Sequence, residues 1–219
     1  MIKAIIFDAE GVVIDTHSLW VRGDIKFIKN HSSVQNPEKI YHENIVSKIV
    51  GHSILDGAIV MQKILGFPGE PEDLAKERMV TMENLFENDI KFIDGFVDFF
   101  NAQVKNIYKT AIGTAIKKEL MTLVEKKLPI REFFGKDVYH IYDVGNISKP
   151  NPDIFLYTAK QLGVAPEECV VIEDAPNGIK AAKRAGMKCI ALTTTFHKDK
   201  LTEADIIVEH FKNINLDEI

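Results

Sequence analysis

The chain of 219 residues is 46% hydrophobic and 27% charged, which is typical of a soluble globular protein with one sizeable domain or a domain that carries a smaller insert. Its formal net charge of -5 excludes a global positive field that would attract nucleic acid or an anionic membrane. No apolar run approaches membrane-spanning length and the amino terminus lacks the features of a secretion signal, so we expect a cytoplasmic protein.

The first predicted element is a buried strand over residues 4–7. This stretch is a short continuous apolar run, which suits a strand covered on both faces, and it ends at Asp8 with Gly11 three residues further on. An acidic loop therefore leaves the sheet at a carboxyl edge, where open α/β sheets place their ligands. The alternative is an Asp that only ends the strand and caps a turn.

Residues 16–89 are predicted to be helical throughout. Asn36-Pro37 offers an N-cap with Pro at the first helical position, a second helix stops before Gly66, and a third opens near Pro71. The inward face of this third helix is predicted to carry Ala75, Met79, Met82 and Phe86, with Leu74, Arg78 and Leu85 beside it. Four helices without a strand make a small bundle.

From residue 90 onward, helices and strands are predicted to alternate. The expected strands cover residues 109–114, 139–144, 169–172, 189–192 and 206–208, with a helix before each of the first four. This alternation indicates right-handed crossovers and a doubly wound, mostly parallel sheet. The opening strand belongs to the same sheet. We therefore expect an α/β protein with a Rossmann-like core of residues 1–15 plus 90–219, and a helical domain of residues 16–89 inserted after the first strand.

Polar residues gather at the carboxyl ends of the predicted strands and at one helix start: Asp8, Thr114, Lys149, Glu173 and Asp174. In a parallel sheet these positions converge on one edge. A hydroxyl, an ammonium group and two acidic clusters suit phosphoryl transfer on Mg²⁺, because this ion prefers hard oxygen ligands. Taken singly, a Thr at a strand end or a Lys before Pro would be a surface residue without a function.

Four motifs resemble those of the haloacid dehalogenase superfamily, in the branch of β-phosphoglucomutase and small phosphosugar phosphatases. They are Asp8-Ala9-Glu10-Gly11-Val12, the strand end Thr114-Ala115, Lys149-Pro150-Asn151-Pro152-Asp153, and Val171-Ile172-Glu173-Asp174-Ala175-Pro176-Asn177-Gly178-Ile179. By itself, Gly178 would be read as a helix-start residue. The resemblance extends over the whole chain. It implies that the helical insert is a mobile cap domain that closes over the active site.

The resemblance implies that Asp8 is a nucleophile that forms an aspartyl-phosphate, with Glu10 at the general acid/base position. Mg²⁺ would be bound by Asp8, the backbone carbonyl of Glu10 and Asp174, and Glu173 would be a further ligand or a neighbour of the ligands. The phosphoryl oxygens would be held by Thr114, Lys149 and the backbone N–H groups of Ala9, Glu10 and Ala115. Phosphatases and mutases of the family normally have Asp where this chain has Glu10.

Three functions remain open: a Mg²⁺-dependent phosphatase of a small phosphorylated metabolite such as a sugar phosphate, a β-phosphoglucomutase-like isomerase, and a catalytically weak protein that binds phosphate and metal. The mutase ranks second because no Arg follows Gly51 shortly to hold a second phosphate. The candidates for substrate contacts in the insert are Thr16, His17, Lys48 and His52. We expect no nucleic acid or membrane partner, and a monomer or weak dimer.

Overall fold

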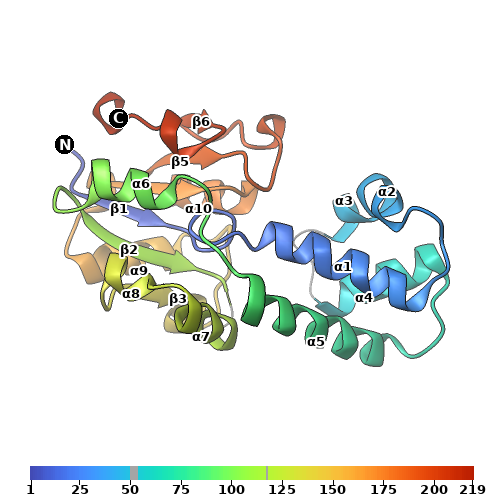
Figure 1. Cartoon of the computed structure of the whole chain (residues 1–219). Coiled ribbons are helices and arrows are strands. Elements are labelled where there is room, and N and C mark those ends of the chain that lie inside the picture. The colour runs from blue at the N-terminus through green and yellow to red at the C-terminus, as the bar shows by residue number, and fades with distance from the viewer. Residues whose placement is uncertain (50–53, 117) are drawn as a thin grey trace. The chain divides into compact units, whose positions relative to one another are not determined.

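The computed structural model describes residues 1–49, 54–116 and 118–219 (Figure 1). The described chain falls into two compact units. The core unit comprises Met1–His17 and Lys91–Ile219, and the helical unit comprises Ser18–Ile90. Within the described residues, no helix combines the length and the apolar character needed to cross a membrane.

In the described part of the core unit, six parallel strands form one sheet in the order β3-β2-β1-β4-β5-β6. The strands are β1 (Ala4–Phe7), β2 (Lys109–Thr114), β3 (Val138–His140), β4 (Cys169–Glu173), β5 (Lys188–Leu192) and β6 (Ile206–Val208). The chain adds β2 and β3 on one side of β1 and β4 to β6 on the other. The carboxyl end of β1 is therefore the switch point at which such sheets bind ligands. The predicted α/β fold is confirmed.

Helices cover both faces of this sheet (Figure 1). On one face, α9 (Asp153–Leu162) and α10 (Pro176–Arg184) enclose a core that includes Ala4, Ile6 and Val171. The other elements of the core unit are α6 (Phe96–Phe99), the π-helical turn η2 (Phe100–Val104), α7 (Lys118–Lys127), α8 (Ile130–Phe134), and the 3-10 turns η3 (Ile141–Val144), η4 (Pro166–Glu168), η5 (Lys198–Lys200), η6 (Phe211–Asn213) and η7 (Leu216–Glu218).

Aromatic rings fill the opposite face of the sheet. The Phe7 ring lies 5.8 Å from that of Phe96, 6.1 Å from Phe100 and 5.4 Å from Phe134, measured between ring centroids. Phe96 and Phe134 come from α6 and α8, so these two helices cover this side. Because both faces are closed, every residue of β1 is fully buried. This explains why its sequence is continuously apolar rather than alternating.

The strand predicted over residues 139–144 is wrong in its second half. β3 ends at His140, and the chain turns at once into η3. The backbone N–H of His140 donates a hydrogen bond of 2.8 Å to the side chain of Asp143. This local bond occupies the His140 N–H, which a longer strand would use for pairing in the sheet. The chain therefore turns instead of extending.

The helical unit contains α2 (Pro37–Ile40), the π-helical turn η1 (Tyr41–Ile45), α3 (Val46–Ile49), α4 (Ile54–Leu65) and α5 (Pro71–Asp89), and all of α1 (His17–His31) except its first residue. Its apolar core includes Phe27, Ile28, Tyr41, Ile45, Ala58, Met61 and Leu74. The helical character predicted after the first strand is confirmed.

A buried ion pair replaces one predicted apolar contact in the helical unit. Arg78 is 5% exposed, whereas Met79 is only half-buried. Arg78 Nε lies 2.7 Å from Asp24 Oδ1, and Arg78 Nη2 lies 3.1 Å from Asp24 Oδ2. Asp24 also accepts the Tyr41 hydroxyl at 3.1 Å, and Arg78 Nη1 donates to the Ile54 carbonyl at 3.2 Å. Leu74 and Arg78 therefore take the inward positions in the first half of α5, whereas Met82 and Phe86 are buried as predicted.

We expect Arg78→Met to lower the free energy of unfolding by about 3–5 kcal/mol, because it leaves the Asp24 carboxylate buried without a cation. The double variant Asp24→Leu/Arg78→Met removes both charges and should lie close to wild type, since an apolar pair of similar volume avoids the desolvation cost. Urea denaturation of the three proteins measures the difference. An Arg78→Met protein as stable as wild type would show that the ion pair does not stabilise this unit.

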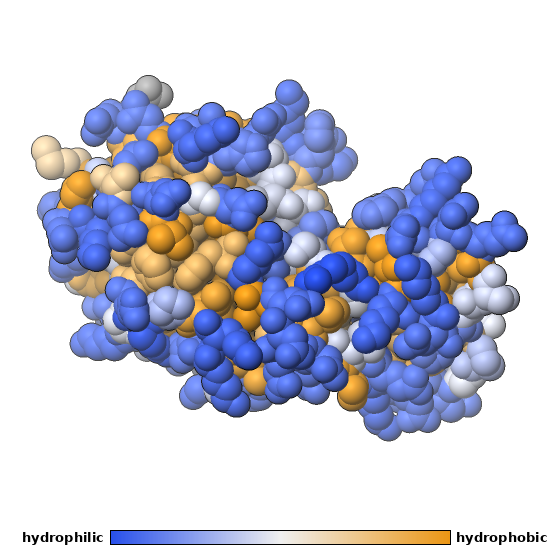
Figure 2. Space-filling model, viewed as in Figure 1, coloured by the Kyte–Doolittle hydropathy of each residue, from blue (hydrophilic) through white to orange (hydrophobic). Residues whose placement is uncertain are grey.

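Large hydrophobic side chains are scattered over the surface. Hydrophilic residues cover most of the face shown in Figure 2. The exposed hydrophobic residues of the described chain are Met1, Ile59, Val80, Ile107, Tyr142, Ile147 and Leu156. They are shared between both units, as is usual for single hydrophobic residues on a protein surface.

Candidate active site

Three carboxylates lie together at the carboxyl edge of the sheet. Asp8 follows β1, Glu173 ends β4 and Asp174 follows it, and one oxygen from each lies within 4.8 Å of the others. The hydrogen bond of 3.0 Å from the Asp8 N–H to the Ile172 carbonyl holds these strand ends side by side. All three acids are buried, with exposures of 7%, 1% and 4%. Neighbouring parallel strands therefore bring together residues that are 165 or more positions apart in the sequence.

Lys149 reaches into this acidic cluster from the loop before α9. Its Nζ lies 2.5 Å from Asp8 Oδ1 and 2.6 Å from Glu173 Oε1. The ammonium group also lies 4.7 Å from the centroid of the Phe155 ring. Among the described residues, Lys149 is the one cation that is ion-paired within this cluster, and its partners are Asp8 and Glu173. Negative charge therefore remains uncompensated at the site.

Burial and neighbouring charges raise the pKa values of Asp8 and Asp174. Burial raises the pKa of Asp8 to about 6, against the opposing effect of the Lys149 ammonium. Burial, followed by repulsion from Glu173 and Asp8, raises the pKa of Asp174 well above its usual range. Burial alone would lower the pKa of Lys149, but the two carboxylates outweigh it and raise the value, so this side chain stays charged. A buried site with surplus negative charge favours a cation.

Glu173 is held by the protein itself. Its Oε2 accepts the N–H groups of Asp174 at 2.9 Å and Ala175 at 3.1 Å, while Oε1 faces Lys149. Both carboxylate oxygens of Glu173 therefore already accept hydrogen bonds from the protein. Asp8 and Asp174 are the better candidates for direct metal contact, and Glu173 fixes the lysine and the turn that carries Asp174.

Two glycines have a steric reason to be at the site. A Cβ atom on Gly178 would lie 1.7 Å from Glu173 Oε1, so the Glu173 carboxylate would have to move away from Lys149 and from the N–H groups that it accepts. The interpretation of Gly178 as a helix-start residue therefore missed the Glu173 carboxylate, which lies beside it. Gly11 has a φ of +75°, and a Cβ there would lie 1.9 Å from Asp174 Oδ2. Only glycine allows these backbones to approach the acids so closely.

The predicted phosphate-binding residues lie around the same edge. Thr114 ends β2, is 1% exposed, and its Oγ1 accepts the Ile116 N–H at 3.1 Å. That bond leaves the hydroxyl hydrogen of Thr114 available as a donor. Ala9 is buried, Glu10 is half-buried and Ala115 is exposed.

The predicted substrate-contact residues are not brought together by one element. Thr16 is buried, and its N–H donates to the Ile14 carbonyl at 2.9 Å. His17 is the first residue of α1 and is half-buried. Lys48 is exposed on α3 of the helical unit. His52 lies outside the described residues.

The turn after β5 supplies two side chains that the sequence reasoning missed. Thr194 Oγ1 donates to the Gly11 carbonyl at 2.5 Å, and the side chain of Thr195 is hydrogen-bonded to the Asp174 carboxylate. A run of three threonines after a predicted strand has no distinctive spacing. The signal that could have found it is its position, since β5 neighbours β4 and its carboxyl end lies at the same edge of the sheet.

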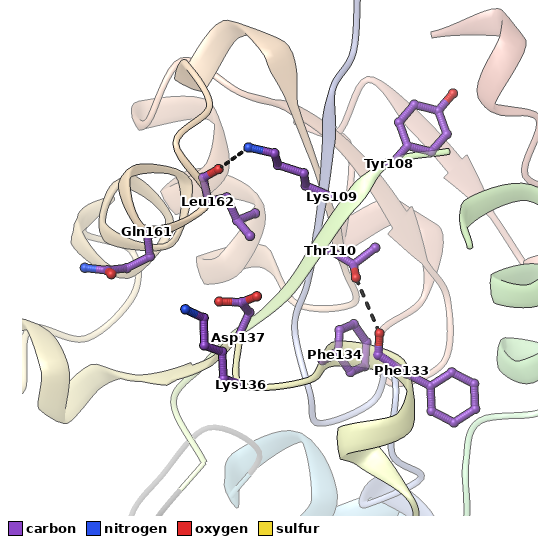
Figure 3. A pocket seen from close by; sticks show the side chains of 9 residues that line it. All are labelled: Tyr108, Lys109, Thr110, Phe133, Phe134, Lys136, Asp137, Gln161 and Leu162. Carbon is purple, nitrogen blue, oxygen red and sulfur yellow. Dashed lines mark hydrogen bonds between the residues drawn. The ribbon is translucent and has the colours of Figure 1, made fainter. Parts of the chain in front are cut away.

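A cavity of about 430 Å³ opens at the other edge of the sheet (Figure 3). Lys109 and Thr110, at the amino end of β2, lie beside it, and Lys109 Nζ donates to the Leu162 carbonyl at 2.7 Å. The carboxylates of the candidate site follow the opposite ends of the parallel strands. This cavity is therefore distinct from the site that the carboxylates form.

Comparisons with known proteins agree with the motifs. A family model described as haloacid dehalogenase-like hydrolase matches residues 2–186. Hexitol phosphatase A of Escherichia coli (strain K12) is 40% identical over 219 residues, covering 98% of this chain and 94% of that protein. The phosphorylated carbohydrates phosphatase of Thermotoga maritima is 26% identical over 188 residues, covering 86% and 83%. The resemblance inferred from the motifs is confirmed.

A solved structure gives the same result for the fold. The HAD family hydrolase from Deinococcus radiodurans R1 with bound phosphate and sodium superposes with a TM-score of 0.79. The match covers 96% of this chain and 92% of that chain at 21% identity. At 21% identity, this similarity supports the fold assignment alone.

Proposed function

The chain belongs to the haloacid dehalogenase-like hydrolase family, and on this basis we propose that it is a Mg²⁺-dependent phosphatase of a small phosphorylated carbohydrate. The observation that carries the proposal is the Asp8–Lys149 pair beside Glu173 and Asp174 at the switch point of the sheet. The names of two relatives, a hexitol phosphatase and a phosphorylated carbohydrates phosphatase, support the substrate class.

The donor set fits a hard divalent cation. Asp8, Asp174 and the backbone carbonyl of Glu10 would hold Mg²⁺ through oxygen atoms, which this ion prefers. The buried acids with surplus negative charge are the structural support for this assignment. When bound, the ion supplies positive charge that offsets repulsion between the attacking carboxylate and the phosphoryl group.

Asp8 is the proposed nucleophile. Its carboxylate oxygen forms a bond to phosphorus while the bond from phosphorus to the ester oxygen breaks, and the departing alkoxide takes a proton from the Glu10 carboxyl. Water then attacks phosphorus and gives its proton to Glu10, which releases inorganic phosphate and restores Asp8. Thr114 and Lys149 would hold the phosphoryl oxygens as charge develops on them.

The helical unit is proposed to act as a cap that selects the substrate. Residues 16–89 are the proposed cap domain, and the proposed contacts are Thr16, His17, Lys48 and His52. A cap that closes over a phosphatase site excludes water until the substrate is bound. The phosphate group is recognised by the core unit, so the carbohydrate portion would be distinguished by this second unit.

A screen of phosphorylated metabolites that reports released phosphate tests the proposal. We expect Mg²⁺-dependent release from hexitol phosphates or sugar phosphates, and none with a chelator. Incubation with β-glucose 1-phosphate and a bisphosphate primer should yield free phosphate faster than glucose 6-phosphate. Faster formation of glucose 6-phosphate would instead identify a mutase, and no turnover of any phosphoester would leave a binding protein.

Metal binding should depend on pH because protons compete for the same carboxylates. The pKa of Asp8 is raised from 3.8 to about 6, so the stability that this group gives the metal-free protein is full below pH 3.8 and is lost as pH rises through about 6. A divalent cation binds the ionised form. Its apparent affinity should therefore increase as the pH rises through about 6, and the raised pKa of Asp174, the second carboxylate ligand, extends this increase to higher pH.

Melting curves with and without Mg²⁺ between pH 5 and 8 measure this competition. We expect the rise in melting temperature caused by Mg²⁺ to be small at pH 5 and large at pH 7.5. The Asp8→Asn variant, which has one titrating ligand fewer, should show a weaker dependence on pH. An equal stabilisation by Mg²⁺ at both pH values would contradict the proposed ligands.

Glu10 is the position at which the chain departs from the family pattern, and we expect Glu10→Asp to raise kcat. A glutamate carboxylate reaches about 1.5 Å further than that of aspartate, and a misplacement of about 1 Å can lower a rate by on the order of a hundredfold. The gain should be greater for sugar phosphates than for aryl phosphates, because an aryl leaving group needs little protonation. Affinity for Mg²⁺ should not change, since the proposed ligand is the Glu10 carbonyl.

Steady-state kinetics of wild type, Glu10→Asp and Glu10→Gln on one alkyl and one aryl phosphate test this expectation. Glu10→Gln serves as the control that keeps side-chain length and removes the acid, and it should lose most turnover of the alkyl ester. If Glu10→Asp lowers kcat on alkyl phosphates at unchanged Mg²⁺ affinity, glutamate is an adapted catalyst at this position.

A further inference from the structure

The turn that follows β5 is fixed at the edge of the sheet that carries the acids. β5 pairs with β4, with Ala191 beside Glu173, so the chain leaving β5 runs next to the Glu173–Asp174 pair. The N–H of Thr193 donates to the Val208 carbonyl at 3.0 Å, which ties the start of the turn to β6. The next two threonines therefore have a defined position relative to the acidic cluster.

Both of these threonines bond to the candidate site. Thr194 donates through Oγ1 to the carbonyl of Gly11, in the loop that carries Asp8 and Glu10. The hydroxyl of Thr195 bonds to the Asp174 carboxylate. A Cβ atom placed on Gly11 would lie 1.9 Å from Asp174 Oδ2 and 2.7 Å from Thr195 Oγ1. Three chain segments, the loop after β1, the end of β4 and the turn after β5, thus meet at one point.

We propose that Thr195 is a positioning residue that sets the orientation of the Asp174 carboxylate for metal binding, with Thr194 holding the Gly11 loop against it. The inference rests on the proposed function, because it assigns Asp174 as a metal ligand. A carboxylate on a single turn can rotate about its side-chain bonds. A hydroxyl bonded to it restricts that rotation and leaves the remaining lone pairs directed at the ion.

Because it leaves the Asp174 carboxylate free to rotate, loss of the Thr195 hydroxyl should weaken the binding of a divalent cation. Replacing such a partner of a metal ligand typically lowers metal affinity by about 10–100-fold.

Mg²⁺ affinity, measured by calorimetric titration of the full chain at pH 7.5, tests the proposal. Thr195→Val keeps the branched shape and removes the hydroxyl, and its dissociation constant should rise by about 10–100-fold. Thr195→Ser keeps the hydroxyl and should remain within about threefold of wild type. Thr193→Val is the matched control, because the Thr193 hydroxyl makes no hydrogen bond with the described residues. Its affinity should equal that of wild type.

Melting temperatures in EDTA separate a structural effect from an effect on the metal. If Thr195→Val lowers the melting temperature in EDTA but binds Mg²⁺ as tightly as wild type, the hydroxyl supports the fold only and the proposal is overturned. If wild type itself binds no Mg²⁺, the proposed metal site fails, and the role of Thr195 fails with it. A weakened affinity in Thr195→Val that Thr195→Ser restores supports the positioning role.

Discussion

Asp8→Asn should lower phosphate release by about 10³-fold or more, because an amide cannot attack phosphorus and is a weaker metal ligand than a carboxylate. The measurement is initial-rate release of phosphate from an aryl phosphate at saturating Mg²⁺. Aryl esters are suitable because their leaving group does not depend on Glu10. Undiminished turnover in this variant would contradict the assignment of Asp8 as nucleophile.

The fold should survive this change, so a loss of rate can be interpreted. The amide of the Asp8→Asn variant would still offer an oxygen to the Lys149 ammonium, which in the wild-type protein lies 2.5 Å from the Asp8 carboxylate. One negative charge fewer beside Glu173 and Asp174 reduces repulsion in the metal-free protein. We therefore expect an equal or higher melting temperature in EDTA. Asp153→Asn, a change of an acid at the start of α9, is the matched control and should keep wild-type turnover.

Lys149→Met should combine a large loss of rate with a large loss of stability. Removing a donor that faces developing oxyanion charge lowers kcat by about 10²–10³-fold. The variant also leaves Asp8 and Glu173 buried without their cation. Breaking a buried pair in this way lowers the free energy of unfolding by about 3–5 kcal/mol. Kinetics and urea denaturation of the metal-free protein at pH 7.5 measure the two effects.

The stability deficit of Lys149→Met should shrink at low pH. Lys149 lowers the pKa of Asp8 against burial, so its removal raises that pKa above about 6. The protonated Asp8 then contributes stability that is present below pH 3.8 and is lost as pH rises through the new value. The deficit relative to wild type should therefore be greater at pH 8 than at pH 5. A deficit independent of pH would mean that methionine disturbs packing rather than charge.

Lys149→Arg separates charge from shape at the same position. The guanidinium keeps the positive charge between Asp8 and Glu173, so most of the stability should return. Its planar fork is larger and less adaptable than an ammonium group, and we expect little recovery of kcat. Full recovery of rate would show that only net charge at this position is required.

The sheet could be predicted because its strands are buried on both faces. The apolar run of β1 indicates a strand that is buried in the middle layer. The acids at the ends of β1 and β4 indicate that the site lies at the carboxyl edge of the sheet. The convergence of Asp8 and Asp174 follows from parallel topology, and Lys149 joins them from the loop before α9. Local bonding is harder to anticipate. Asp143 ended β3 early by accepting the His140 N–H, which a period-2 pattern does not indicate.

Pairs that are distant in sequence were not predictable from one chain. Asp24 and Arg78 are buried together although 54 positions separate them, and helical periodicity does not indicate that they pair. Thr194 and Thr195 contact Gly11 and Asp174 through the same kind of long-range pairing. Periodicity places a side chain on a face, but only the folded chain shows which polar group meets it.

Detection of phosphorylated Asp8 tests the central proposal most directly. The protein would be mixed with an aryl phosphate and Mg²⁺, quenched with borohydride during turnover and digested for mass spectrometry. Borohydride reduces an acyl phosphate to an alcohol, so we predict homoserine at position 8, dependent on substrate and Mg²⁺ and absent in Asp8→Asn. Steady phosphate release with unmodified Asp8, or with the modification at another carboxylate, would contradict the proposed mechanism.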